Sequence, residues 1–411
     1  MNLELFIARR LLKGRGKSAV SVPIVKIALA GIALGVCFML LSVFIITGFK
    51  KEIKDKLSGF FAHMNVVSYG NILSPAEERV SVSDTLLGAL RGIDGVKDLY
   101  VYVTKPAILK SDKEIHGVVL NGVDSLYTGD FFKKNLLSGE FPDYRTPKAS
   151  DEILISSAVA AYLGLRVGDR VGAHFVQDPP RLRSFTLKGI YETGFKEYDD
   201  VFAICDIRHL QRLNAWKGNE VTGIALELTD LKDTQKMEEK VEDLLYAGNE
   251  EAFYSITTLR QTAPQLFDWL ELINMNVWII LVLIVTVAGF NMVSGLLILI
   301  LDKTVLIGIL KALGYKDINL RKLFLYISVG LIGRGLIWGN ILALLLGGAQ
   351  YYGGIVHLDP ASYYMDTVPV YFNVYYILLL DIGVLVVSTL MLVVPTMLIS
   401  RINPIQVIRF E

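Results

Sequence analysis

Residues 27–49 read IALAGIALGVCFMLLSVFIITGF, a run of 23 residues that contains no charged side chain. A helix of about 20 apolar residues is long enough to cross the hydrocarbon core of a bilayer. The run is too long for the apolar part of a signal peptide, and no cleavage pattern of small residues follows it. The sequence therefore predicts a membrane-spanning helix here, and it excludes a soluble enzyme, a disordered chain or a free nucleic-acid binder.

Three further apolar stretches and one long polar region make up the rest of the chain. Apolar residues form 53% and charged residues 20% of its 411 residues, and 27 Lys and Arg and 34 Asp and Glu lie between Lys50 and Glu271. We therefore expect a polar α+β domain inserted between the first two of four spans. The expected order is an N-terminal segment 1–26, span one 27–49, an outer domain with stalks 50–276, span two 277–301, a loop 302–322, span three 323–350, a loop 351–373, span four 374–400 and a tail 401–411.

Basic residues in the short flanks predict the orientation, because Lys and Arg favour the cytoplasmic side of a membrane. Six Lys and Arg lie between Arg9 and Lys26 and five lie in 302–322, whereas 351–373 contains none. Both termini and the 302–322 loop are therefore expected in the cytoplasm, with 50–276 and 351–373 outside. Four lysines directly after span one argue the other way, but acidic residues alternate with them.

The polar region alternates short runs rich in Val, Ile, Phe and Tyr with amphipathic segments, without a regular βαβ rhythm. This pattern is typical of an α+β domain. Strands are expected at 64–69, 99–103, 118–122, 153–155, 170–176, 185–191, 201–205 and 222–228, and helices at 83–91, 158–163 and 232–245. Residues 50–60 and 258–276 are expected to extend spans one and two as helical stalks.

No pattern of residues in the chain predicts catalysis. Residues 14–18 read GRGKS, like the end of a phosphate-binding loop, but the next element is a membrane span and not the helix of a nucleotide-binding fold. The five histidines are scattered, and Cys37 and Cys205 lie in different regions, so neither a metal site nor a disulfide is expected. Asp199 and Asp200 are expected on a solvated face.

Two charged residues, Arg334 and Asp381, interrupt the last two spans. A charge inside a membrane is costly and usually faces protein or water. Two arrangements are open: the side chains pair between antiparallel helices, or Asp381 reaches the outer interface while Arg334 faces a groove. A proton relay would need more than one acidic residue.

The loop 302–322 reads DKTVLIGILKALGYKDINLRK. Val305, Ile309 and Leu313 recur every four residues and mark one apolar face of a helix, and Gly314 is a natural helix stop. An amphipathic helix between two spans fits either an anchor at the membrane interface or a docking element for a cytoplasmic partner. The pattern alone leaves both open.

The segment Ile307-Gly308-Ile309-Leu310-Lys311-Ala312-Leu313-Gly314 resembles the coupling segment of the FtsX/MacB class of ABC-transporter permeases. Further matching segments follow in order along nearly the whole chain, at 31–36, 48–49, 59–63, 120–124, 163–169, 189–194, 199–200, 403–405 and 409–411. Together they resemble permeases of the lipoprotein-releasing, LolC/LolE type. The resemblance implies four transmembrane α-helices and a large α+β, MacB-like periplasmic core domain inserted between helices 1 and 2.

The resemblance also implies a transport subunit that is not an enzyme and holds no cofactor. A separate cytoplasmic ATPase dimer would bind ATP and Mg²⁺, and a second permease subunit, identical or paralogous, would complete the complex. ATPase closure would drive the outer domains by mechanotransmission, releasing lipoproteins from the inner membrane of a Gram-negative bacterium to a periplasmic carrier. The alternative is an FtsX-like signalling permease that activates an extracytoplasmic partner without transport; the large outer domain favours lipoprotein release. Membrane lipids, and no nucleic acid, are expected as further partners.

Three sets of contact residues follow from the resemblance. The residues expected to contact the ATPase are Lys303, Ile307, Gly308, Leu310, Lys311, Ala312, Leu313, Gly314, Arg409 and Glu411. Those expected to contact lipoprotein acyl chains are Phe44, Phe49, Met275 and Trp278, for which an interfacial aromatic belt is the open alternative. Those expected to contact the carrier are Pro179, Pro180 and Arg181, in a segment (177–183) that is short compared with the long hairpin loop of one family branch. Leu306 stands where the family often has an acidic residue.

Overall fold

The computed structural model describes residues 3–13, 21–68, 79–229, 234–248 and 254–397. The chain divides into two compact units. The first, the helical unit, comprises Met1–Lys50, Trp269–His357 and Thr367–Glu411, and the second, the sheet domain, comprises Lys51–Asp268 and Leu358–Asp366. The boundary between them falls inside two helices, α2 (Ser21–Phe61) and α10 (Pro264–Asp302).

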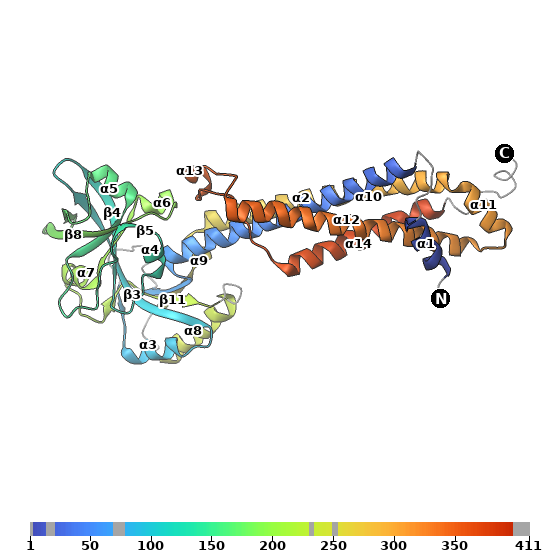
Figure 1. Cartoon of the computed structure of the whole chain (residues 1–411). Helices are drawn as coiled ribbons and strands as arrows, with labels where there is room; N and C mark the ends of the chain where they lie inside the picture. The colour runs from blue at the N-terminus through green and yellow to red at the C-terminus, as the bar shows by residue number, and fades with distance from the viewer. Residues whose placement is uncertain (1–2, 14–20, 69–78, 230–233, 249–253, 398–411) are drawn as a thin grey trace. The chain divides into compact units, whose positions relative to one another are not determined.

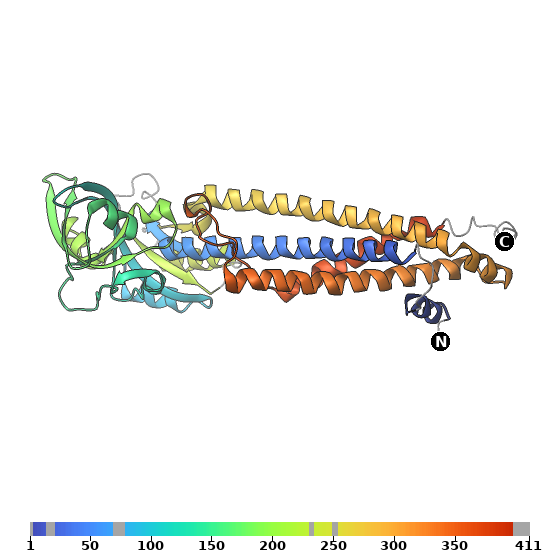
Figure 2. The same ribbon diagram turned by 45° about the horizontal axis from the view of Figure 1, so that its top comes forward.

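Four helices among the described residues are long and apolar enough to cross a membrane: α2, α10, α12 (Asp317–Gly353) and α14 (Val374–Thr396) (Figure 1). Within the helical unit, α2, α10 and α12 run side by side (Figure 2). Their contact is close because α12 presents glycines to α2. A Cβ on Gly335 would lie 2.5 Å from a methyl carbon of Ile32, and one on Gly339 would lie 2.7 Å from Val36. Small residues spaced four apart let helix backbones approach in this way.

Two shorter helices belong to the same unit. Helix α1 (Leu3–Lys13), which the sequence did not predict, packs on α12 with Ala8 buried. Helix α11 (Thr304–Ala312) lies in the connection between α10 and α12, and so occupies the loop in which an amphipathic helix was expected.

The sheet domain combines twelve strands and eight short helices among its described residues. The strands are β1 (Met64–Ser68), β2 (Val80–Ser81), β3 (Val96–Lys110), β4 (Ile115–Val123), β5 (Leu136–Gly139), β6 (Glu152–Ser156), β7 (Arg170–Phe175), β8 (Arg181–Tyr191), β9 (Phe202–Asp206), β10 (Glu220–Val221), β11 (Gly223–Leu228) and β12 (Tyr254–Thr258). The helices are α3 (Asp84–Arg91), α4 (Asp130–Lys134), α5 (Ser157–Leu163), α6 (Lys196–Asp199), α7 (Ile207–Leu213), α8 (Thr234–Gly248), α9 (Leu259–Thr262) and α13 (Pro360–Tyr363).

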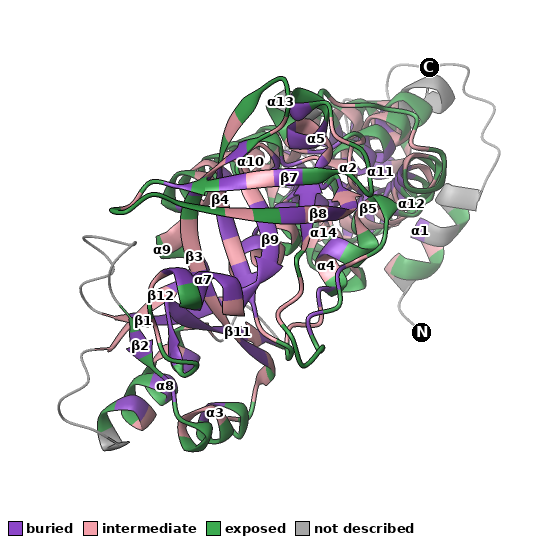
Figure 3. Cartoon of the chain, turned by 90° about the vertical axis from the view of Figure 1, so that its left-hand side faces the viewer, coloured by how far each residue is buried: buried purple, intermediate pink, exposed green. Residues whose placement is uncertain are grey.

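The long strand β3 is shared by two halves of the sheet domain. Residues 96–102 pair with β11 in the open row β12-β1-β11-β3, which α3 and α8 accompany. Residues 102–110 pair with β4 and, at the end, with β7. The second half therefore closes as a ring in the order β3-β4-β9-β6-β8-β7 and back to β3. Closure leaves these strands without free edges. Buried apolar residues of β4, β9 and β11 contribute to the core (Figure 3).

The predicted fold class, four apolar helices with a large α+β domain inserted between the first two, is confirmed. Each of the eight expected strands and three expected helices is present. The additional elements of the sheet domain include β2, β5, β10, β12, α4, α6, α7 and α13. The stalk expected at 50–60 is the end of α2. The stalk expected at 258–276 is interrupted at Ala263, where φ is −130° and ψ is 60°, before α10 begins at Pro264. Proline suits the first position of a helix, since it has no N–H to pair.

Candidate functional site

One face of helix α11 packs into the helical unit. Ile307 and Gly308 are buried, and Leu310 packs against the same apolar core. Lys311 pairs with Asp317 at 3.0 Å, which joins the last turn of α11 to the start of α12. These four residues from the predicted ATPase-contact set therefore also hold the helix in place.

The opposite face of α11 is exposed. The side chains of Val305, Ile309 and Leu313 are 52%, 47% and 79% exposed, so the apolar stripe expected from the sequence has no cover within the described chain. Ala312 is exposed beside them, and Gly314 ends the helix with φ at +83°. A left-handed residue after the last turn is the usual way for glycine to stop a helix.

The remaining residues of the predicted ATPase-contact set are Lys303, Arg409 and Glu411. Lys303 precedes α11 as its N-cap and pairs with Asp302 at 2.7 Å. Arg409 and Glu411 lie outside the described residues. The exposed members of the predicted set and of the apolar stripe, on α11 and directly after it, are thus Val305, Ile309, Ala312, Leu313 and Gly314.

Two of the four residues expected to contact acyl chains are buried within the helical unit. Phe44 is fully buried, its ring meets Phe372 edge-on at 5.1 Å, and its carbonyl oxygen accepts a hydrogen bond from the Tyr371 N–H. Phe49 meets Trp269 edge-on at 5.5 Å. Both phenylalanines therefore have intramolecular packing partners, and a polar substitution at either position would disturb the fold itself.

Met275 and Trp278, the other two, lie on α10 with 56% and 59% of their surfaces exposed. They remain free to meet lipid, an acyl chain or a second protein. The structure thus separates the four residues into a buried pair and an exposed pair, and only the exposed pair is accessible to a ligand.

The residues expected to contact the carrier lie where β7 turns into β8. Pro179 and Pro180 are exposed in the turn and Arg181 is exposed at the first position of β8. Val176 and Leu182 beside them are exposed apolar side chains. The turn is accessible, and the connection from Phe175 to Arg181 is as short as the sequence indicated.

Asp381 accepts two hydrogen bonds from a residue that the sequence did not single out. The Nδ2 atom of Asn340 lies 3.0 Å from each carboxylate oxygen of Asp381, linking α12 to α14. Arg334, two turns earlier on α12, is exposed, and no ion pair between it and Asp381 occurs in the described chain. The available signal in the sequence was the amide of Asn340 in the middle of the apolar 323–350 stretch, because a polar group in a span needs a partner.

Asp199, expected on a solvated face, is buried. Its carboxylate accepts hydrogen bonds from the Thr193 N–H at 3.1 Å and the Thr193 hydroxyl at 2.8 Å. Burial raises the pKa of Asp199, while the hydrogen bonds from Thr193 act in the opposite direction. The same turn carries Phe195, whose ring meets Tyr364 edge-on at 4.6 Å. The solvated-face prediction is wrong for Asp199, because this carboxylate holds the turn between β8 and α6.

Two other side chains of the sheet domain have shifted pKa values and also form hydrogen bonds with main-chain groups. Burial lowers the pKa of His63 to about 4, and its Nδ1 atom accepts a hydrogen bond from the Leu228 N–H. Burial raises the pKa of Asp124 to about 6, against the effect of backbone hydrogen bonds from Leu126 and Val101. Both side chains therefore stabilise the strand ends beside them. Among the described residues, no group of three or more His, Cys, Asp or Glu side chains is placed to hold a metal ion.

Comparisons with known proteins agree with this arrangement. The model of the MacB-like periplasmic core domain matches residues 27–244, and the model of the FtsX-like permease C-terminal domain matches residues 278–404. The first match spans the first membrane helix and most of the sheet domain. The second spans α11 and the last three membrane helices, with the Asn340–Asp381 contact between two of them.

Three relatives that match over their full length are named as transmembrane proteins of a lipoprotein-releasing system. The lipoprotein-releasing system transmembrane protein LolC of Xylella fastidiosa (strain 9a5c) is 26% identical over 427 residues, covering 100% of this chain and 99% of the relative. LolC of Neisseria meningitidis serogroup B is 26% identical, with 100% of both chains covered. LolE of Haemophilus influenzae is 22% identical, with 99% of each covered. The chain therefore belongs to the FtsX/MacB-like family of ABC-transporter permeases, and it is similar over its whole length to the LolC and LolE proteins.

Proposed function

We propose that this chain is the permease subunit of an ABC transporter that releases lipoproteins from the inner membrane of a Gram-negative bacterium to a periplasmic carrier. A separate ATPase dimer binds ATP and Mg²⁺ and drives the permease, which pairs with a second permease subunit. The names and full-length coverage of the LolC and LolE relatives support the lipoprotein substrate. The observation that best supports coupling between the ATPase and this chain is the exposed apolar stripe of α11, which lies between two membrane-spanning helices.

The stripe fits a docking element. Ile307 and Lys311 fix the helix from behind, so Val305, Ile309 and Leu313 are presented on a held surface. Apolar side chains of this kind form the buried centre of protein interfaces. Docking of the ATPase here moves α11 together with α10 and α12. Helices α2 and α10 continue into the sheet domain, which gives mechanotransmission a continuous helical path along the chain.

The orientation in this proposal puts α11 and both termini in the cytoplasm and the sheet domain in the periplasm. We expect a membrane-impermeant thiol reagent added from the periplasmic side to label Glu114→Cys, in the exposed β3–β4 turn, and not Lys316→Cys, beside α11. The native Cys37 and Cys205 are both buried, which keeps the background low. Labelling of Lys316→Cys from outside, with Glu114→Cys protected, would reverse the orientation.

Depletion of the chain in its own cells tests the substrate. We expect lipoproteins destined for the outer membrane to accumulate at the inner membrane, measured by fractionation, while lipoproteins that normally remain there are unaffected. Normal sorting after depletion, accompanied by loss of an extracytoplasmic enzyme activity, would instead support the signalling type of permease.

A further inference from the structure

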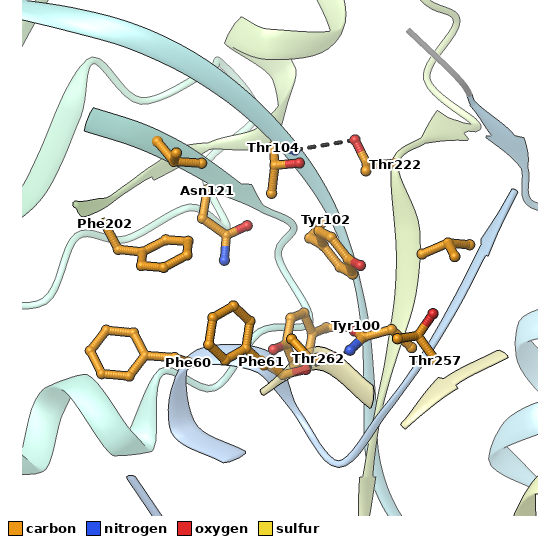
Figure 4. A pocket seen from close by; sticks show the side chains of 13 residues that line it. Phe60, Phe61, Tyr100, Tyr102, Thr104, Asn121, Phe202, Thr222, Thr257 and Thr262 are labelled. Atoms are coloured by element: carbon orange, nitrogen blue, oxygen red, sulfur yellow. Dashed lines mark hydrogen bonds between the residues drawn. The ribbon is translucent and has the colours of Figure 1, made fainter. Parts of the chain in front are cut away.

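The sheet domain contains a cavity of about 540 Å³ that lies on one face of its sheet. Side chains from β1, β3, β4, β9 and β12 line it, together with the end of α2 (Figure 4). Ligand-binding pockets typically range from about 300 to 1,000 Å³, so this space has the size of a binding site. It is made entirely of residues of the sheet domain and is separate from α11 and from Met275 and Trp278 in the sequence.

The hollow exists because the strand between β1 and β3 carries small residues. On β11, Gly223 lies between Val67 and Tyr102, and Ala225 lies between Asn65 and Tyr100. Directly opposed residues of an antiparallel pair project to the same face. A Cβ on Gly223 would lie 2.8 Å from the Tyr102 hydroxyl. The larger side chains of β1 and β3 therefore flank the small residues of β11, which form the base of the cavity.

One wall of the cavity is aromatic. The rings of Phe60, Phe61 and Phe202 lie 5.5 to 6.5 Å apart between centroids, in tilted and edge-on arrangements. Phe60 and Phe61 are the last two residues of α2. Aromatic faces offer a large apolar contact area to a ligand. Figure 4 shows these rings on the side of the cavity opposite Tyr102 and Thr257.

The polar groups that face the cavity are neutral. The carboxamide of Asn121 points into the space between Phe61 and Tyr102 (Figure 4), and its Oδ1 atom is buried without a hydrogen-bond partner among the described residues. Thr104 stands opposite Asn121 across β3 and β4, and its backbone N–H donates to the Thr222 hydroxyl at 3.2 Å. None of the thirteen lining residues is charged. A charged ligand would lose its hydration here without gaining a counter-charge.

We propose that this cavity binds an uncharged peptide segment with apolar side chains. The Nδ2 atom of Asn121 carries two N–H donors, and one of them would donate to a backbone carbonyl oxygen of the peptide. The Oδ1 atom of the same carboxamide is buried and does not take part in this contact. The phenylalanine rings receive the apolar side chain of the segment. Because α2 ends in this wall, the occupied site contacts a helix that continues into the helical unit.

The test uses the purified full-length chain in lipid nanodiscs and the blocked peptide acetyl-Gly-Val-Ser-Tyr-Gly-amide. Saturation-transfer difference NMR should show contact between the peptide and the protein, and none with empty nanodiscs. Asn121→Asp should weaken binding at least about tenfold, because it replaces the donor amide by a poorly solvated carboxylate. Tyr102→Phe, which removes only a hydroxyl from the wall, should weaken it about threefold.

Matched variants on exposed positions control for the chemistry of each change. Asn219→Asp, in an exposed loop, and Tyr246→Phe, on the exposed side of α8, should bind the peptide like the unaltered chain. A peptide with Asp in place of Val and Tyr should not bind. Equal binding to all four variants, absence of transfer to the neutral peptide, or transfer to maltose in its place would overturn the proposal. The measurement needs neither ATPase nor carrier, so its failure is distinct from failure of the release function.

Discussion

Leu313→Asp is expected to lower the amount of ATPase that co-purifies with this chain by about 100-fold, together with ATP-driven function. Leu313 is the most exposed residue of the apolar stripe on α11. Its replacement should leave the fold intact, because 79% of its surface is exposed. An interface that covers it would have to bury an unpaired carboxylate, which costs several kcal/mol. Pull-down of the ATPase and its turnover in the complex measure the effect.

Two comparisons separate docking from folding at α11. Leu137→Asp changes an exposed leucine of β5 in the same way and should leave ATPase binding unaltered. Gly308→Glu, by contrast, places a charge at a buried position, so it is expected to reduce the yield of folded protein. If the Leu313→Asp complex retains its ATPase and normal turnover, α11 is only an anchor at the membrane interface.

Trp278→Asp is expected to reduce lipoprotein release by at least about tenfold while leaving assembly with the ATPase intact. The proposal puts Trp278 and Met275 beside the route of the acyl chains, where each buried CH₂ contributes about 0.8 kcal/mol. A carboxylate on this surface removes apolar contact and introduces a group that lipid tails cannot solvate. A photo-crosslinker at position 275 should capture a lipidated protein and not its unlipidated variant.

Tyr352→Asp is the matched control for this experiment. Tyr352 lies in the last turn of α12 and is 90% exposed, as expected for an aromatic side chain in a membrane-interface belt. It lies outside the proposed acyl-chain residues, so the substitution should leave release near normal. Equal loss of release in Trp278→Asp and Tyr352→Asp would assign Trp278 to the belt and remove it from the acyl-chain route.

The parts of the fold that depend on local pattern could be predicted from the sequence. The four spans follow from uninterrupted apolar length, and strands such as β8 and β11 follow from runs of branched and aromatic residues. The closed ring of strands could not be predicted, because the pairing of β7 with the end of β3 joins residues more than 60 positions apart. Short helices such as α4 and α6 carry too few residues to show a period.

The candidate sites show the same division. The spacing of apolar residues in α11 identified its exposed stripe. It could not identify Ile307 as buried, because that burial depends on packing against other helices. The residue type of Phe44 suits a lipid-facing position. Its side chain is buried because Phe372, far along the chain, packs against it. The cavity beside Asn121 depends on Gly223 lying between two strands that are distant in sequence. In each case the sequence shows the type of the residue but not the distant residue that packs against it.

ATP-dependent release from proteoliposomes tests the central claim most directly. The purified chain, its second permease subunit and the ATPase are reconstituted with a radiolabelled lipoprotein, and the soluble carrier is added outside the vesicles. The account predicts that lipoprotein appears bound to the carrier only with ATP and Mg²⁺, and that the Leu313→Asp complex releases none. ATP hydrolysis that is normal while the lipoprotein stays in the membrane, with carrier present, would contradict the account.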